Sequence, residues 1–365
     1  MNRSAALRAA SPERLEIVEV ARELGRRTLA PAALDLDERK SGALDAVWKQ
    51  VVEVGFDRAL APTDNDGAGL DAETLLLCLE EIAAGDGGIA MLVLLSNAAL
   101  VVLPPELLTK TPASMRWALL PAPPEELPTG ARVTVEKRSG ATTLSGRLCP
   151  ALGALCADGI VVVTREPEPA VLAFPDGTGD VEMTLAEPQL GLRSAVAACI
   201  SFSGAKAAVA LPPADAVVAA AQSMALLRGG AAAIARGIAR RAQEMALAYA
   251  EMRFQGGVPI VAHDAVREML AGMAVRLASA PCPPATPDAA AASVIAVKVA
   301  NTDAAVTTTT DAVQVFGGTG YMHETGIEKL MRDTKMLQLW PEPNWVGRKL
   351  VAGALSGRAG AVPQS

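Results

Sequence analysis

The chain has 365 residues, a length that corresponds to two or three domains. Apolar residues make up 51% and charged residues 20%, which excludes a disordered or fibrous protein. The formal net charge of −7 offers no basic field for phosphates, so we expect no nucleic-acid partner. Five cysteines without CxxC spacing and two distant histidines predict no metal site, and the scattered thiols indicate a reducing, cytoplasmic compartment.

The N-terminal part of the chain shows helical periodicity from about Pro12 to Leu108, and we assign an α-helical domain to residues 1–115. Asp71 is expected to cap a helix over residues 72–84. The longest apolar run, Ile89 to Leu103, is too short to cross a bilayer comfortably. We therefore predict a buried helix there and no membrane span.

The residue pattern changes in the middle of the chain, over residues 116–212, which we assign to a central β-domain. Short β-branched runs separated by glycine and aspartate turns predict a small antiparallel sheet domain. These runs cover residues 133–135, 160–164, 170–174 and 199–202.

Helical periodicity returns over residues 213–365. The pattern predicts helices over 214–252, 263–279 and about 288–315, with many small side chains that permit close helix packing. The order helical, sheet, helical places the protein in the α+β class.

The most informative segment is Asp311–Tyr321, which reads DAVQVFGGTGY and is followed by Met331–Lys335, MRDTK. A helix that ends in Gly317-Gly318 exposes backbone that a ligand can approach, and the amide of Gln314 can donate a hydrogen bond. The same glycines suit an ordinary helix C-cap, so both interpretations stay open at this point.

As a longer pattern, DAVQVFGGTGY…EKLMRDTK resembles the C-terminal signature of the acyl-CoA dehydrogenase family. Further similarities lie at Leu29-Ala30-Pro31, Glu80–Ala83, Leu190–Ser194, Tyr249 and Arg253. The chain is therefore identified as a divergent member of that family. The resemblance implies an N-terminal helical domain, a small central β-barrel or sheet domain and a C-terminal four-helix bundle.

The resemblance also implies function. FAD is expected between the β-domain and the C-terminal helices of a dimer. Arg253 is expected to contact its pyrophosphate from the neighbouring subunit, and Gln314, Gly317 and Gly318 to pack on it. The implied reaction is α,β-desaturation of an acyl-CoA thioester, with an electron-transfer flavoprotein as acceptor. The implied assembly is a homodimer, a homotetramer or a heteromer with a related subunit.

The catalytic base is where this sequence departs from the family pattern. Alignment on Arg332–Lys335 puts Pro341 at the position of the usual glutamate, with Glu342 one residue later. A minority of the family takes its base from the first long C-terminal helix, but that position is Leu227 here. We therefore predict Glu342 as the catalytic base.

Three functions remain open from the sequence. The first is an active FAD-dependent acyl-CoA dehydrogenase that uses Glu342. The second is a non-catalytic, FAD-contacting subunit of a heteromeric acyl-CoA dehydrogenase. The third is a helical scaffold that has lost its cofactor.

Overall fold

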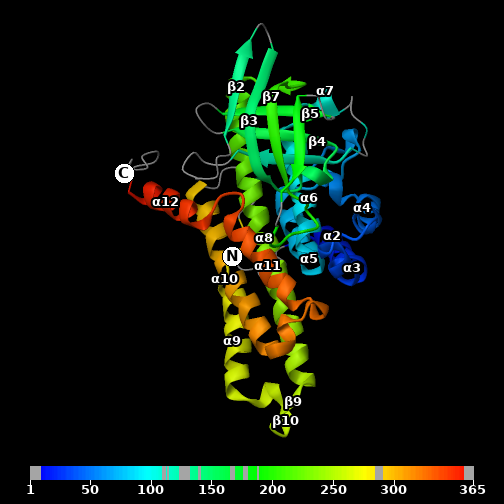
Figure 1. Cartoon of the computed structure of the whole chain (residues 1–365), viewed down its shortest axis with the longest axis vertical. Coiled ribbons are helices and arrows are strands. Elements are labelled where there is room, and N and C mark those ends of the chain that lie inside the picture. Colours follow the sequence, from blue (N-terminus) through cyan, green and yellow to red (C-terminus); the bar gives the residue numbers. More distant parts are fainter. Residues whose placement is uncertain are drawn as a thin grey trace.

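The computed structural model describes residues 10–108, 112, 115–122, 132–138, 141–164, 169–175, 180–186, 189–283 and 291–356. Figure 1 shows an elongated molecule with the sheets at one end and the C-terminal helices extending to the other. The N-terminal helices lie against one side of the long helix α8. This arrangement confirms the α+β class, with helices at both ends of the sequence around a small sheet region.

The N-terminal region is helical, as its periodicity predicts. Its helices are α2 (Pro12–Leu24), a π-helix (Gly25–Leu29), α3 (Ala30–Asp37), α4 (Ala43–Glu53), α5 (Ala72–Gly85), α6 (Gly87–Val102) and α7 (Pro105–Leu108). The side chain of Asp71 accepts a hydrogen bond from the Thr74 N–H at 2.7 Å and caps α5 as expected. Helix α6 is buried along nearly its whole length, which confirms the buried helix predicted for the apolar run.

The central region forms two separate four-stranded sheets in the described residues. The first has the strand order β1 (Trp117–Pro121), β4 (Gly159–Thr164), β5 (Ala170–Pro175), β8 (Val209–Ala210). The second has the order β2 (Val133–Arg138), β3 (Ala141–Ala151), β7 (Ala198–Lys206), β6 (Val181–Leu185).

Pairing in these sheets is antiparallel except between β1 and β4, which run parallel. The purely antiparallel sheet predicted from the sequence is therefore wrong at this pair. The chain leaves β1 for the β2–β3 hairpin of the second sheet before it returns as β4, so the two strands enter the first sheet in the same direction.

The C-terminal region consists of α8 (Pro213–Met252), α9 (Asp264–Ser279), α10 (Ala291–Phe316), α11 (Ile327–Leu339) and α12 (Asn344–Leu355). A short hairpin of β9 (Phe254–Gln255) and β10 (Val258–Pro259) joins α8 to α9. Among the described residues, α8 is the one helix long and apolar enough to cross a membrane. However, 61% of its most apolar window is buried inside the protein, as in a core helix.

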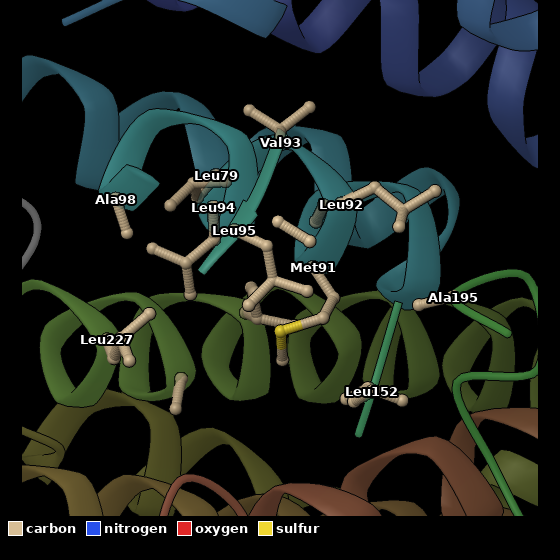
Figure 2. Packing of buried hydrophobic residues seen from close by; sticks show 14 of the residues in the cluster. Leu79, Met91, Leu92, Val93, Leu94, Leu95, Ala98, Leu152, Ala195 and Leu227 are labelled. Atoms are coloured by element: carbon tan, nitrogen blue, oxygen red, sulfur yellow. The ribbon is translucent and has the colours of Figure 1, made fainter. Parts of the chain in front are cut away.

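Helices α6 and α8 pack directly on each other in the core. Figure 2 shows Met91, Leu94 and Leu95 of α6 lying along α8, the helix that carries Leu227. Leu227 has no exposed surface. The alternative base position of the family is thus occupied by a core side chain in this protein.

A fully buried ionic cluster ties the three regions together. Lys329 of α11 contacts Asp86 Oδ2 at 2.9 Å and Asp333 Oδ2 at 2.6 Å. Asp333 accepts a hydrogen bond from the Leu192 N–H at 2.6 Å, and Asp86 accepts one from Ser194 Oγ at 2.6 Å. Burial lowers the pKa of Lys329, but the two carboxylates outweigh it and raise that pKa. The cluster therefore fixes α11 against the α5–α6 junction and the loop that precedes β7.

Two cysteines of the second sheet are joined. Cys149 of β3 and Cys199 of β7 form a disulfide, with their Cα atoms 4.3 Å apart, although they are 50 positions apart in the sequence. The expectation of scattered thiols is wrong for this pair. Strand pairing brought the two side chains together, and their spacing in the sequence carries no sign of it.

Candidate active site

An apolar cavity of about 250 Å³ lies between the sheets and the C-terminal helices. Its walls come from β1 and β3 on one side and from the end of α11 and the α11–α12 connection on the other. The lining residues are Leu120, Pro121, Leu148, Cys149, Pro150, Ala151, Leu152, Met336, Leu339, Trp340, Pro341 and Pro343. A cavity with these walls suits a flat or aliphatic group and keeps water away from it.

Glu342, the predicted base, lies in the α11–α12 connection, and its neighbours Pro341 and Pro343 both line the cavity. Its own side chain is turned toward α8 and is 1% exposed. Oε1 accepts a hydrogen bond from Arg228 Nε at 2.9 Å, and Oε2 accepts one from Arg228 Nη2 at 3.3 Å. The carboxylate is therefore held by a two-point, buried ion pair.

A buried lysine supports the same connection from α10. Lys298 Nζ donates to the backbone oxygen of Glu342 and to Asn344 Oδ1, each at 2.8 Å. Asn344 Nδ2 in turn donates to Thr302 Oγ1 at 2.9 Å. Burial lowers the pKa of Lys298 to about 8, although Glu342 opposes the shift. These bonds hold the segment from Glu342 to Asn344 in one conformation.

The predicted cofactor residues Arg253, Gln314, Gly317 and Gly318 are all exposed, where α8 and α10 end. The rings of Tyr249 and Phe316 stack there with centroids 4.2 Å apart, which brings the two helix ends together. A Cβ added at Gly317 or Gly318 would meet no atom within 4 Å, so the glycine backbone is open to a ligand.

The structure therefore separates the predicted site residues into two groups. Arg253, Gln314, Gly317 and Gly318 lie at the end of the C-terminal helices marked by β9 and β10 in Figure 1, away from the sheets. Glu342 lies near the sheets, in the connection between α11 and α12. Within one chain these two groups do not meet.

Sequence reasoning missed two residues of this site. Arg228 follows Leu227, which occupies the alternative base position of the family, and Lys298 interrupts an apolar stretch of α10. A single lysine on a buried helix face signals a polar partner in the core, because an unpaired buried charge is costly. No pattern in the sequence shows that this partner is the α11–α12 connection.

The residues present fit FAD in chemical terms. An exposed guanidinium at Arg253, with no partner among the described residues, suits a diphosphate, and the open glycine backbone permits close approach. The apolar cavity suits a flat aromatic ring system. A helical–sheet–helical chain with these features is typical of flavin-dependent dehydrogenases.

Two models of known protein families match this chain. Residues 11–106 match the family described as acyl-CoA dehydrogenase, N-terminal domain, and residues 217–355 match acyl-CoA dehydrogenase, C-terminal domain. Together they cover more than half of the chain, and the central sheets lie between them. The protein belongs to the acyl-CoA dehydrogenase family, whose members are FAD-dependent oxidoreductases.

Individual relatives agree over nearly the whole length. The chain is 28% identical to cyclohex-1-ene-1-carbonyl-CoA dehydrogenase of Geobacter metallireducens, over 93% of this chain and 96% of that protein. It is 27% identical to the mitochondrial short-chain specific acyl-CoA dehydrogenase of Bos taurus, over 92% of this chain and 88% of that protein. The fold is similar to glutaryl-CoA dehydrogenase of Mycobacterium smegmatis in complex with FADH2, with a TM-score of 0.84, 17% identity and 97% of each chain covered.

Proposed function

We propose that this protein oxidises an acyl-CoA thioester by removing one hydrogen from the α-carbon and one from the β-carbon. The observation that carries the proposal is the apolar cavity between the sheets and the C-terminal helices, in a chain of this family. When bound, FAD supplies the acceptor for the β-hydrogen, which leaves as hydride.

The residues of the chain have separate roles in this proposal. Arg253 binds the diphosphate by charge and hydrogen bonds, and the backbone at Gly317 and Gly318 lets that group approach closely. Gln314 donates an amide hydrogen bond beside them. The walls formed by Leu148 and Trp340 exclude water around the reacting carbons, which strengthens every polar interaction there.

Glu342 is the proton acceptor that we propose, with one condition. Both of its oxygens accept hydrogen bonds from Arg228, so the carboxylate must leave this pair and turn toward the cavity to reach an α-proton. Its backbone already lies at the cavity wall, because Pro341 and Pro343 on either side line the cavity.

The test of this role is the Glu342→Gln variant. Glutamine keeps the size of the side chain and cannot take up the proton, so acyl-CoA-dependent reduction of an artificial electron acceptor should fall by at least about 100-fold. The flavin absorption of the purified protein should persist. Glu268→Gln, a change of an exposed carboxylate on α9, is the control and should keep full activity. Undiminished turnover in Glu342→Gln would exclude the assignment.

The cofactor end has its own test. Arg253→Ala should lower the amount of FAD that remains bound through gel filtration by at least about tenfold, because a charge-assisted contact to a diphosphate is lost. Its melting temperature without flavin should match that of the wild type, since Arg253 is exposed and its side chain has no partner among the described residues. Arg267→Ala on α9 is the matched control. Equal FAD retention in Arg253→Ala and Arg267→Ala would contradict this role.

A second function is favoured by one observation, the ion pair between Glu342 and Arg228. If this pair stays closed, the chain serves as the FAD-contacting, non-catalytic member of a heteromer, and a related subunit supplies the base. The two functions differ in the isolated chain. A homo-oligomer that oxidises acyl-CoA on its own excludes the heteromer, whereas flavin binding without turnover favours it.

The remaining parts of the proposal concern the electron acceptor, the oligomeric state and the cellular location. The family reaction passes electrons to a second protein, and we propose an electron-transfer flavoprotein as acceptor. Because the cofactor residues and the cavity do not meet within one chain, we propose at least a dimer, either homomeric or heteromeric. We place the assembly in the cytoplasm.

A further inference from the structure

The disulfide between Cys149 and Cys199 lies at the wall of the cavity. Cys149 is one of the lining residues, and Cys199 faces it from the neighbouring strand β7. Both side chains are half-buried, so a small molecule can reach them.

The pairing of β3 and β7 is interrupted at this place. Leu148 pairs with Ile200 and Ala151 pairs with Ala198, so β3 has one residue more than β7 between these pairs. Such a bulge weakens the backbone ladder and redirects a side chain. The bond between the two sulfur atoms therefore joins the strands where their hydrogen bonding is irregular.

The buried cysteines of the described chain are unsuited to thiol exchange. Burial raises the pKa of Cys78 to about 12 and also raises the pKa of Cys156, and both thiols are enclosed in the core. Exchange requires a thiolate that is accessible. Cys149 and Cys199 combine access with a partner at bonding distance.

We propose that Cys149 and Cys199 are a redox-active pair that exchanges with low-molecular-weight disulfides of the glutathione class, and that its state changes the wall of the cavity. In the oxidising direction the two thiols form the Cys149–Cys199 bond. Their two electrons cleave the S–S bond of the small disulfide, and their two protons end on the two small thiols released. In the reducing direction two small thiols give their two protons and two electrons to the pair, which restores both cysteines as thiols, and leave joined to each other as the small disulfide.

The consequence for the cavity follows from the position of Cys149. In the oxidised pair its sulfur is bonded to β7, whereas in the reduced pair its thiol is free to turn toward Trp340 and the other lining residues. A change in cavity shape affects catalysis only if the cavity holds the reacting groups, so this consequence rests on the proposed function. The exchange itself does not depend on that function.

The experiment equilibrates the full chain in oxidised and in reduced glutathione buffers, quenches with acid, and labels thiols with a maleimide after denaturation. Mass spectrometry should count five labels in the reduced chain, which has five cysteines. It should count three in the oxidised chain, with the loss at Cys149 and Cys199. Cys282→Ser should again lose two labels on oxidation, whereas the double variant Cys149→Ser/Cys199→Ser, which can form neither the internal bond nor a mixed disulfide at this pair, should lose none.

The state of the cavity is read by the fluorescence of Trp340, taken as the difference between the wild type and Trp340→Phe. This signal should change between the two buffers in the wild type and stay constant in Cys149→Ser/Cys199→Ser. Five labels in both buffers, or a loss located at other cysteines, would overturn the exchange. A disulfide that forms with no change in Trp340 emission would overturn its effect on the cavity. Neither the label count nor the Trp340 fluorescence requires turnover. Both measurements therefore test the exchange even if the proposed function is wrong.

Discussion

Removal of the Arg228 side chain tests how the Glu342 carboxylate is held. Glu342 is 1% exposed, so in Arg228→Met its charge cannot return to water, and the guanidinium that accounts for both hydrogen bonds is gone. Breaking one partner of a buried pair costs about 3–5 kcal/mol. Lys298 lies close by, with Nζ 2.8 Å from the backbone oxygen of Glu342, and offers partial compensation. We expect a loss near the lower end, about 3 kcal/mol.

The double variant Arg228→Met/Glu342→Gln removes both charges together. It should cost only about 1–2 kcal/mol, because what remains is a buried amide that has lost its hydrogen bonds. The control is Arg348→Met, whose pair with Asp303 is 59% exposed on the arginine side and should contribute less than about 1 kcal/mol.

The assay is urea unfolding followed by circular dichroism, with the free energy of unfolding compared across the wild type, both single variants and the double variant. The expected result is a coupling energy of at least about 1.5 kcal/mol between Arg228 and Glu342. A free energy of unfolding for Arg228→Met within about 0.5 kcal/mol of the wild type, or single effects that simply add, would show that Arg228 does not hold the Glu342 carboxylate.

Two further predictions concern stability. The pKa of Lys298 is about 8 in the folded protein against 10.5 ordinarily, so the unfolded chain binds more protons between these pH values. The free energy of unfolding of the wild type, relative to Lys298→Met, should therefore rise by about 3 kcal/mol from pH 8 to pH 10.5, measured by urea unfolding; a flat difference would contradict the shift. A Cβ at Gly237 would lie 2.1 Å from the backbone oxygen of Glu80 on α5, so Gly237→Ala should lower stability by about 1–3 kcal/mol in thermal unfolding. Gly318→Ala, which meets no atom within 4 Å, should not; equal melting temperatures for these two variants would refute the close contact.

Much of the fold follows from local signals. The helix predicted over residues 214–252 is found as α8, Pro213–Met252, and the strand run 160–164 is found in β4, Gly159–Thr164. Periodicity suffices for these elements because a helix or strand with one buried face must repeat apolar residues at its own spacing. The parallel pairing of β1 with β4 was not predictable in this way, since pairing depends on the path of the chain between the strands.

The candidate site likewise has features that follow from local sequence and features that depend on packing. The family signature around Gln314 and Gly317 is continuous in the sequence, so it identifies a flavoenzyme without any knowledge of how the helices pack. The one-residue offset between Pro341 and Glu342 is also visible there. Both features lie within short segments of consecutive residues, so they can be recognised without knowing how the chain packs.

What these residues touch depends on how distant segments pack. Arg228 and Glu342 are 114 positions apart, and Cys149 and Cys199 are 50 apart, yet each pair is in direct contact. Such contacts arise because helices and strands from distant segments pack to bury their apolar faces, and the polar groups carried along must then find partners within reach. The family and the order of the elements can be inferred from consecutive residues, whereas the pairing of Glu342 with Arg228 beside the cavity results from packing.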